Sequence, residues 1–477
     1  TGKCTYKNTL KATNPKGINN DYCKFIRLGQ NFVEKTQEGV LAYISGNTFL
    51  DTRLFRGMRY NLLKEFDEIY ILNLHGSSKR DEGGDDVKDE CVFDIQVGVS
   101  INVFVKRKNK NDKKLATVHY KDLYGTRKEK LDYLSTHSFV DIDFETIEPF
   151  APIYAFRTRN EEVRQNYEQG FRIRELMPEG VKQGFTTGID SLIMHMNKDS
   201  IVSFCQDIMQ NTAFNDIKSK YAFSEVDRKK YEKLVAKVKA SNFNPINKIR
   251  KVAFRPFDNR WSVYCGLFMD RPRPEIQKNI LDKDNVVLCI GQEGSSLGDS
   301  EWSLVYCTEI ATDKNMIPRG GVYIFPLYIY DGFLKTINFS PTILRSIESL
   351  INRELQNLEE QERQEGGFLA VDLIDYIYAV LHSVTYRDTY HDFLQNDFPV
   401  IPYPKSAEYF FNMADLGKQL RDLHQLRSIE HKDFITQFPM TSPTDNNIVR
   451  LRKFEETEDG VGKVWINKHQ YFDNVPT

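Results

Sequence analysis

The cysteines are the first residues in this chain whose types suggest chemistry. Seven cysteines stand at positions 4, 23, 91, 205, 265, 289 and 307. No two of them form a Cys-x-x-Cys pair, which is the spacing typical of zinc sites and of dithiol redox centres. We therefore interpret them as free thiols in a reducing compartment and predict no metal site.

A second group of reactive side chains lies in the segment FRPFDNRW, which contains Arg255, Asp258 and Arg260. Metal-dependent nucleases usually need several acidic groups around their ions, and Asp258 stands alone. We predict instead a structural Arg–Asp network beside an aromatic core. His382 lies in an apolar helical pattern and is predicted to be a core histidine rather than a ligand. The glycines at 291–299 lack the spacing and the Lys-Ser/Thr ending of a phosphate loop.

The elements that position these residues change in character near residue 140. The first part alternates strands and helices, which predicts a doubly wound sheet with helices on its faces. Helices are expected at 21–37 and, capped by Asp51, at 52–66, with strands at 40–45, 68–74 and 98–108. The first two strands are almost continuously apolar, as expected of strands buried on both faces. A complete nucleotide-binding sheet has about five strands or more and a Gly-rich first turn, so this part resembles only the second half of one.

The rest of the chain reads as a mixture of helices and strands. Helices are expected at 160–169, 190–240, 341–363, 371–395 and 406–429, strands recur between 249 and 330, and one isolated strand is expected at 462–472. The predicted fold class is therefore α/β and α+β, with a partial doubly wound, Rossmann-like sheet followed by a mixed α+β domain. We predict domain boundaries at 1–140, 141–440 and 441–477.

Composition narrows the class of protein. The chain has 477 residues, of which 40% are hydrophobic and 28% charged, and its formal net charge of −2 gives no global nucleic-acid signature. Locally, residues 106–130 hold ten Lys/Arg against three Asp/Glu. This cluster, with Lys106, Arg107 and Lys108, is either a solvated connector or an edge that contacts phosphates. No apolar run reaches the roughly 18 residues of a membrane span, so we expect a cytoplasmic protein without a membrane partner.

Several blocks, taken in order, resemble one family of DNA-modifying enzymes. They read GVLAYISGNTFLD, MRYNLLKEFDEIYILNLHG and VFDIQVGVSINVFVK, then FRPFDNRW, DRPRPEI, FPLYIY, LIDYIYAVLHSVTYRDTY and DFPVIPYPKS. This order is similar to gamma-class N6-adenine DNA methyltransferases fused to a target-recognition domain, most of all the single-chain type ISP enzymes of prokaryotic restriction-modification systems, with type IIG relatives. The resemblance covers nearly the whole chain. It implies the rear half of a methyltransferase domain at 1–140, a target-recognition domain at 141–440, and at 441–477 an extension that looks cut short.

The resemblance also implies what the chain does not contain. The family's cofactor loop and Asn-Pro-Pro-Tyr loop are absent, so no catalytic residue is predicted, and S-adenosylmethionine is expected only in the full-length protein. The segment Asn14-Pro15-Lys16-Gly17 looks like that loop, but Lys16 replaces its second proline and Gly17 its aromatic residue. We predict a turn there, before a helix capped by Asn20 or Asp21. The expected partners are double-stranded DNA and the missing N-terminal half, with the ATPase and nuclease of the full enzymes.

Two regions of the first part are predicted to approach DNA. In similar adenine methyltransferases an aromatic residue near the position of Phe93 packs on the flipped adenine, and the alternative is a core residue beneath the loop. His75 and the loop at 76–90, with Lys79 and Arg80, follow a strand at its carboxyl end, where open α/β sheets place ligands. The alternative for this loop is a disordered surface loop.

In the recognition half, Arg271 and Arg273 of DRPRPEI are candidates for contacts with guanine or phosphate, on backbone that the prolines hold extended. Lys182 is a candidate for the groove between the halves.

We predict that the chain recognises a DNA sequence and supports base flipping for N6-adenine methylation. The parent protein would be an adenine-specific DNA methyltransferase, while this piece alone is expected to be inactive. The alternative is a stand-alone specificity subunit that acts in trans with a separate catalytic subunit. A nuclease or other hydrolase is a further alternative, for which we find no acidic cluster.

Overall fold

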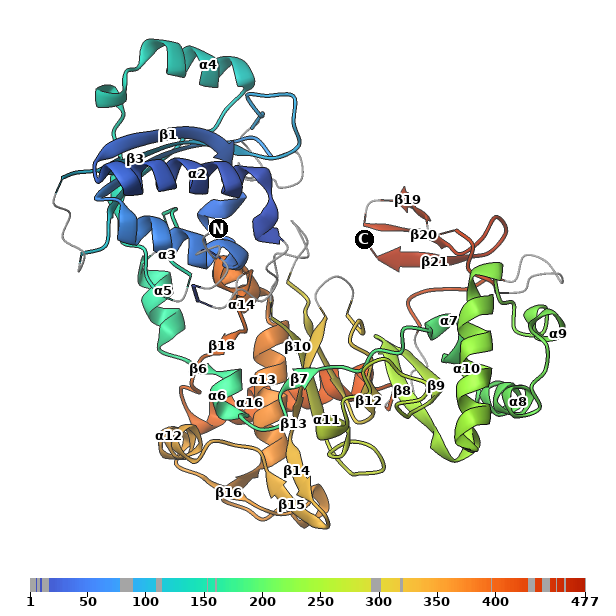
Figure 1. The fold of residues 1–477 in the computed structure, drawn as a ribbon. Helices are drawn as coiled ribbons and strands as arrows, with labels where there is room; N and C mark the ends of the chain where they lie inside the picture. Colours follow the sequence, from blue (N-terminus) through green and yellow to red (C-terminus); the bar gives the residue numbers. More distant parts are fainter. Residues whose placement is uncertain are drawn as a thin grey trace. The chain divides into compact units, whose positions relative to one another are not determined.

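The computed structural model describes residues 6, 9–10, 17–77, 89–108, 114–151, 153–158, 161–292, 302–317, 321–395, 397–427, 434–439, 447–451, 453–458 and 460–476. The chain divides into two compact units, Thr1–His424 and Gln425–Thr477, whose elements are drawn in Figure 1. Within the described ranges, no helix is both long and apolar enough to cross a membrane.

The first unit begins with a five-stranded sheet in the order β1-β3-β2-β4-β5. β3 lies antiparallel between β1 and β2, so β1 and β2 run in the same direction, and β4 lies parallel beside β2. β1, β2 and β4 therefore end at one edge of the sheet, which we call the carboxyl edge. The strands span Gly39–Gly46 (β1), Glu68–His75 (β2), Val99–Lys106 (β3), Thr117–Asp122 (β4) and Glu145–Ile147 (β5).

Helices cover both faces of this sheet (Figure 1). α2 (Asp21–Thr36) and α3 (Arg56–Glu65) pack on one face, in a core that includes Ile69 of β2. α4 (Arg127–Thr136) covers the other face, where Leu134 packs on the cluster that includes Leu72. Short 3-10 helices complete this part: η1 (Gly17–Asn19), η2 (Asn47–Leu50), η3 (Arg53–Phe55) and η4 (Phe139–Asp141).

The helix starts follow local chemistry, with one difference from the sequence prediction. Asn20 caps α2, because its side chain accepts a hydrogen bond from the Cys23 amide at 3.1 Å, as predicted. The first three residues of the Asn14–Gly17 segment, Asn14, Pro15 and Lys16, lie outside the described residues. Asp51 does not cap the next helix. Its carboxylate instead accepts a hydrogen bond from Arg157 at 2.9 Å, and the helix begins only at Arg56.

Burial differs between the two strands that were expected to be buried on both faces. β2 lies inside the row and is buried from Ile71 to His75, as predicted. β1 was predicted wrongly, because it lies at the end of the row, where its residues alternate in exposure. Val40 and Ile44 are 64% and 48% exposed.

The rest of the first unit is organised around one large core. A four-stranded sheet in the order β11-β10-β13-β7 packs against α12, α13 and α16. α13 and α16 approach so closely that a Cβ on Gly417 would overlap the main-chain oxygen of Asp375. The elements span Lys182–Gln183 (β7), Val287–Gly291 (β10), Val305–Thr308 (β11), Val322–Pro326 (β13), Pro341–Ile351 (α12), Ala370–His382 (α13) and Ala407–His424 (α16).

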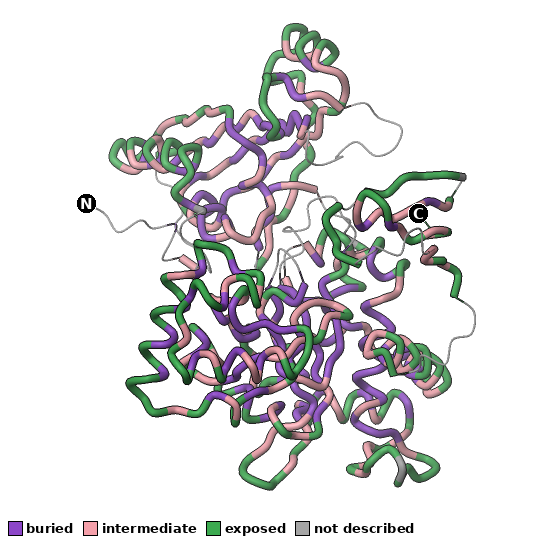
Figure 2. The backbone as a smooth tube through the Cα atoms, turned by 90° about the vertical axis from the view of Figure 1, so that its right-hand side faces the viewer, coloured by how far each residue is buried: buried purple, intermediate pink, exposed green. Residues whose placement is uncertain are grey.

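A second, mainly helical core packs beside the hairpin of β8 and β9, which β12 extends to three strands. Figure 2 shows buried segments, in purple, mainly in the interior, and exposed positions, in green, mainly along loops and the outward sides of the coiled segments. The elements span Asp190–Ile193 (α7), Lys198–Met209 (α8), Phe214–Lys218 (α9), Glu225–Asp227 (η5), Arg228–Ser241 (α10), Pro245–Lys248 (η6), Ile249–Arg255 (β8), Asp258–Val263 (β9) and Ala311–Thr312 (β12).

Shorter elements connect these cores. Two-stranded pairs form between β14 and β15, β16 and β17, and β18 and β6. The elements span Glu161–Glu168 (α5), Phe171–Arg172 (β6), Ile173–Leu176 (α6), Pro274–Gln277 (α11), Tyr328–Asp331 (β14), Leu334–Ile337 (β15), Glu354–Gln356 (β16), Glu360–Glu362 (η8), Gly367–Leu369 (β17), Val384–Thr389 (α14), His391–Leu394 (α15) and Val400–Ile401 (β18). The helix predicted over 341–363 ends at Ile351, because Asn352 adopts a left-handed conformation that terminates it.

The second unit contains a three-stranded antiparallel sheet, β19-β20-β21. Its strands span Lys453–Glu458 (β19), Val461–Trp465 (β20) and Tyr471–Pro476 (β21). The prediction of one isolated strand here was therefore wrong. The fold class itself, a doubly wound α/β part followed by a mixed α+β part, is confirmed.

Candidate functional site

A network of polar side chains joins β2 and β4 at the carboxyl edge of the five-stranded sheet. Asn73 and Asp122 are paired in the register of the two parallel strands. The Nδ2 atom of Asn73 donates to the Tyr120 hydroxyl at 2.9 Å, and that hydroxyl donates to the Asp122 carboxylate. Nε2 of His75 lies 2.5 Å from Oδ1 of the same carboxylate. Asn73, His75 and Tyr120 are buried, so this network fixes the ends of both strands.

The network keeps Asp122 ionised at neutral pH. Burial alone would raise the pKa of Asp122, but hydrogen bonds from His75 and Tyr120 outweigh burial and hold the pKa below its ordinary value. Burial and the neighbouring carboxylate raise the pKa of Tyr120, so its hydroxyl stays a proton donor. The Asp122 side chain is 33% exposed, so a negative charge faces solvent at this edge.

The loop that leaves this edge after β2 is closed by one buried ion pair. Asp89 accepts hydrogen bonds from the Gly76 amide at 2.6 Å, from the Gly125 amide at 3.2 Å and from Lys130 Nζ at 2.5 Å. The Lys130 side chain is fully buried and also donates to the main-chain oxygen of Leu74 at 2.6 Å. The two ends of the loop are thereby held together.

The two cationic candidates of this loop, Lys79 and Arg80, lie outside the described residues.

Phe93 lies between this loop and β3, close to the carboxyl edge. Its side chain is 46% exposed, and Ile95 and Val97 are 42% and 37% exposed. Three apolar side chains at alternate positions thus face solvent. The exposure of Phe93 is what the stacking hypothesis requires, since a ring buried in the sheet core could not reach a base. Stacking itself stays a prediction.

The basic candidates at the end of β3 lie at the opposite edge of the sheet. β3 runs antiparallel to β2, and Lys106 is paired in register with Gly39, the first residue of β1. Lys106 contacts Glu65 at 2.5 Å and Arg107 contacts Glu68 at 2.9 Å, whereas Lys108 is exposed. The structure therefore does not bring this cluster together with Phe93 and His75, and two of its charges are neutralised.

The candidates of the recognition half lie on connected segments. Lys182 is exposed on β7, and the chain continues to Thr186, whose main chain pairs with that of Arg271 through two hydrogen bonds of 3.0 Å. Arg271 is exposed. The expectation of extended backbone was wrong for Arg273, whose φ of +55° is left-handed at the start of α11.

The segment FRPFDNRW forms the Arg–Asp network predicted for it. Arg255 pairs with the buried Asp313 at 2.9 Å, and Arg260 pairs with Asp258 at 2.8 Å. Both guanidinium groups lie over the Phe254 ring, at 3.8 and 4.6 Å. Burial raises the pKa of Asp313 to about 6.

His382 is held by Arg387, whose Nη2 lies 3.1 Å from its Nδ1. Its Nε2 is buried without a hydrogen-bond partner among the described residues. The ring therefore lies inside the protein, as predicted, but one of its two nitrogens makes no hydrogen bond with a described residue.

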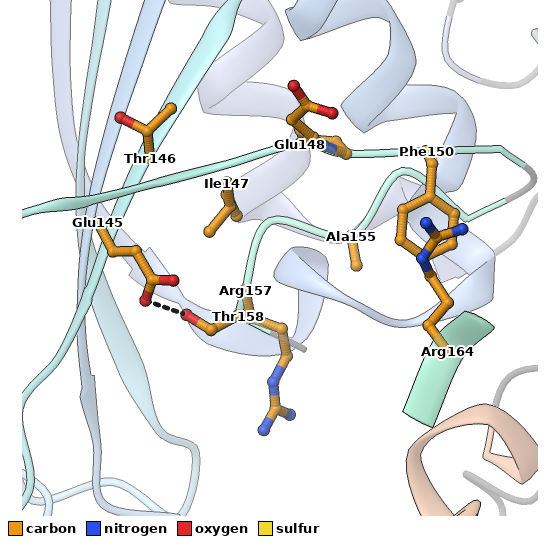
Figure 3. Close-up of a pocket in the computed structure, with 10 residues that line it drawn as sticks. Glu145, Thr146, Ile147, Glu148, Phe150, Ala155, Arg157, Thr158 and Arg164 are labelled. Atoms are coloured by element: carbon orange, nitrogen blue, oxygen red, sulfur yellow. Dashed lines mark hydrogen bonds between the residues drawn. The ribbon is translucent and has the colours of Figure 1, made fainter. Parts of the chain in front are cut away.

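A pocket of about 440 Å³ lies between β5 and α5 (Figure 3). Glu145 accepts a hydrogen bond from the Thr158 hydroxyl at 3.5 Å, and the Arg164 guanidinium lies 4.3 Å from the Phe150 ring centroid. Arg157 contacts Asp51 rather than the pocket's acidic groups. Three of the four charged side chains that line it, Glu145, Arg157 and Arg164, are engaged with other protein groups, so we assign no chemistry to this pocket.

The described residues do not fit a nucleotide cofactor or a metal. The connection after β1 is the buried 3-10 helix η2 rather than a Gly-rich turn that could hold S-adenosylmethionine. No group of three or more His, Cys, Asp or Glu side chains in the described part of the chain has metal-ligand geometry.

Sequence reasoning missed the residues that organise the carboxyl edge. Asn73 and Tyr120 are 47 positions apart, and only the parallel pairing of their strands brings them together. Lys130 stands in a charged helical segment, so its sequence context indicates a solvated residue although it is buried. The one available signal was that the polar residues Asn73 and His75 stand at the end of the apolar strand β2.

A family model described as the type ISP C-terminal specificity domain matches residues 175–477. A search of curated proteins gave no match.

Three solved structures share the fold over 99% of this chain. They are a nuclease-deletion mutant of the type ISP restriction-modification enzyme LlaGI with a DNA substrate mimic (TM-score 0.63, 20% identity), the DrdV–DNA complex (0.64, 21%) and the ATP-dependent type ISP enzyme LlaBIII bound to DNA (0.63, 20%). The chain covers 43%, 47% and 30% of those chains, so it spans less than half the length of each.

Proposed function

The chain belongs to the family of type ISP C-terminal specificity domains, and we propose that it recognises a specific DNA sequence for N6-adenine methylation within a restriction-modification enzyme. The observation that carries this proposal is the match of the specificity-domain model over residues 175–477. Likeness in fold to three proteins solved with DNA or a DNA substrate mimic, over 99% of this chain, supports duplex DNA as the ligand. Base edges in the major groove would supply the sequence information.

The five-stranded sheet has a separate part in this proposal. Phe93 would stack on the flipped adenine, because its half-exposed ring stands near the carboxyl edge, where open α/β sheets bind their ligands. Asn73, His75 and Asp122 would not touch the base. They would hold the ends of β2 and β4 in place. The loop at 76–90 begins at the end of β2, and Phe93 follows that loop.

The methyl transfer itself would belong to a catalytic part outside this chain, which would also hold S-adenosylmethionine. An exposed apolar surface supports such a partner. Tyr22, Phe25 and Phe32 of α2 are 44%, 52% and 59% exposed. Val40 and Ile44 of β1 are exposed on the opposite face of the sheet, because the alternate residues Leu41 and Tyr43 pack toward α2. β1 ends the row of strands, so among the described residues one edge of its backbone has no strand partner. A strand of the catalytic part would extend the sheet there.

The test is selection of duplexes from a randomised pool by this chain, followed by sequencing and a methyl-transfer assay with S-adenosylmethionine. We expect one asymmetric sequence to be enriched and no adenine to be methylated. A pool that stays random after selection would refute sequence recognition, and methylation by this chain alone would refute the placement of catalysis elsewhere.

The alternative arrangement is a specificity subunit that acts in trans. The coding sequence upstream of Thr1 distinguishes a single-chain enzyme from a specificity subunit that acts in trans. An in-frame Asn-Pro-Pro-Tyr loop supports a single chain, whereas a stop codon supports a separate subunit.

A further inference from the structure

The hairpin of β8 and β9 presents an aromatic ring at a position that favours glycine. Arg255 pairs with Asp258, so Pro256 and Phe257 are the central residues of the turn. Proline fixes its own φ at about −65°, and Phe257 has a φ of +61°. These two angles match a type II turn, whose third residue is usually glycine. A bulky side chain is strained there. The Phe257 side chain is 55% exposed, so burial in a core does not explain it.

Contacts from behind hold this ring in place. The Phe257 amide donates to the Tyr306 hydroxyl at 3.3 Å, and that hydroxyl donates to the His424 main-chain oxygen at 2.5 Å. The Phe257 ring stands edge-on to the rings of Tyr306 and His424, with centroid distances of 6.0 and 5.6 Å. The ring is therefore positioned before any ligand arrives, which lowers the entropic cost of a stacking contact.

One face of the same hairpin carries positive charge beside an aromatic ring. Lys251 is paired with Trp261 and Ala253 with Asn259, so Lys251, Asn259 and Trp261 share a face. Lys198, at the start of α8, places its Nζ 5.4 Å from the Trp261 ring centroid. Lys251, Lys198 and Asn259 are exposed.

The described residues leave the charge on this face without an ion-pair partner. Within the described part of the chain, no carboxylate lies within ion-pair distance of Lys251 or Lys198. Arg255 and Arg260 differ, because each is paired with an aspartate. Lys251 and Asn259 on this face, with Lys198 of α8 against Trp261, therefore offer two cations and an amide on the hairpin whose tip carries the exposed Phe257 ring.

We propose that this hairpin contacts duplex DNA, with Lys251 and Lys198 on phosphates and Phe257 stacked on a base at one step of the duplex. This inference rests on the proposed function, which makes DNA the ligand of the specificity half. A two-stranded ribbon fits the major groove, cations give affinity through phosphates, and aromatic rings stack on or insert between bases. An acidic protein could bind Lys251 and Lys198 through its carboxylates, but its binding would not require the fixed aromatic ring of Phe257.

The test uses the whole chain, a fluorescein-labelled duplex pool of mixed sequence, and fluorescence anisotropy over a salt series. Phe257→Gly relieves the left-handed strain, so it should fold at least as well as the wild type while binding about tenfold more weakly. Lys251→Gln should lower the slope of log Kd against log salt concentration by about one unit.

The matched controls lie on the β14–β15 hairpin. There Gly332 occupies the left-handed position, with φ of +61°, and Phe333 is fully exposed. Lys283 places its Nζ 5.9 Å from the Phe333 ring centroid. Phe333→Gly and Lys283→Gln should bind as the wild type does.

The outcomes separate the two proposals. A wild-type chain that binds no duplex would refute the proposed function, and the hairpin inference with it. A wild-type chain that binds, with Phe257→Gly and Lys251→Gln binding equally well, would overturn the hairpin inference alone. Equal losses in the control variants would also overturn it, because they would show that any exposed ring or cation has the same effect.

Discussion

Nε2 of His75 lies 2.5 Å from Oδ1 of Asp122, and this contact ties together the carboxyl ends of the parallel strands β2 and β4. The same carboxylate accepts a hydrogen bond from Tyr120, which in turn accepts one from Asn73. The loop closed by Asp89 and the segment that carries Phe93 both begin from this edge. The network therefore provides a fixed base for the part of the chain that we propose contacts the flipped adenine.

We expect Asp122→Asn to destabilise the chain by about 2 kcal/mol at neutral pH, because it removes charge-assisted hydrogen bonds from a largely buried network. The lowered pKa of Asp122 makes this contribution complete above the ordinary carboxyl pKa. The contribution is lost as pH falls through the folded-state value, so the two proteins should converge in acid. Urea unfolding over a pH series measures the difference. Asp94→Asn, whose side chain is 92% exposed, is the control and should have little effect.

Phe93→Ala should lower adenine methylation by the proposed parent enzyme by about tenfold or more, because one base-stacking contact contributes about 1–3 kcal/mol. Phe93→Trp should retain activity, since it preserves a stacking face. Thermal unfolding should change little, because the ring is half exposed. Ile95→Ala, 42% exposed on the same segment, is the control. Equal losses in Phe93→Ala and Ile95→Ala would argue for a structural effect on the segment.

Lys130→Met should destabilise the chain by about 3 kcal/mol or more, because it leaves the Asp89 carboxylate buried without its cation. Chemical denaturation gives the free energy of unfolding directly. Arg107→Met removes an arginine whose side chain is 66% exposed and paired with Glu68, and it should cost less than about 1 kcal/mol. Similar losses in the two variants would contradict the anchoring role of Lys130.

His382 should make the chain sensitive to acid. Burial first, and then the like charges of Arg387 and His424, lower the pKa of His382 to about 3. The unfolded chain binds this proton near pH 6.5, so stability is complete above that pH and falls as pH drops toward 3. At about pH 5 the loss from this residue is about 2 kcal/mol.

His382→Leu should therefore show a smaller fall in the free energy of unfolding between neutral pH and about pH 5 than the wild type shows. Urea denaturation at the two pH values measures this difference. The other histidines contribute equally to the pH dependence of both proteins, so their contribution cancels in the comparison with the wild type. An unchanged pH dependence would show that His382 takes up its proton in the folded state near the ordinary pKa.

Local patterns predicted the elements of the first part well. The cap at Asn20 and the buried strand β2 follow from residue types within a few positions of each other. β1 has an equally apolar sequence, but its exposure depends on its place at the end of the row, which no local pattern contains. The sheet of the second unit was missed because β19 reads KFEETE, a charged sequence without apolar alternation.

The candidate site was harder to predict because it depends on pairing between distant segments. The basic run at 106–130 suggested a phosphate-binding edge, yet Lys106 and Lys130 are engaged with Glu65 and Asp89. In the hairpin, Lys251 and Trp261 share a face only because of the register of β8 and β9. Phe257 gave no signal, since a left-handed backbone at a phenylalanine is visible only in the structure.

The most direct test of DNA recognition is the ratio of affinities of this chain for a duplex of the selected sequence and for the same duplex scrambled, at one fixed salt concentration. Specific recognition predicts that the selected duplex binds about a thousandfold or more tightly than the scrambled one. Equal affinities for the two duplexes would contradict it, because they would show that the chain binds the phosphate backbone without reading bases.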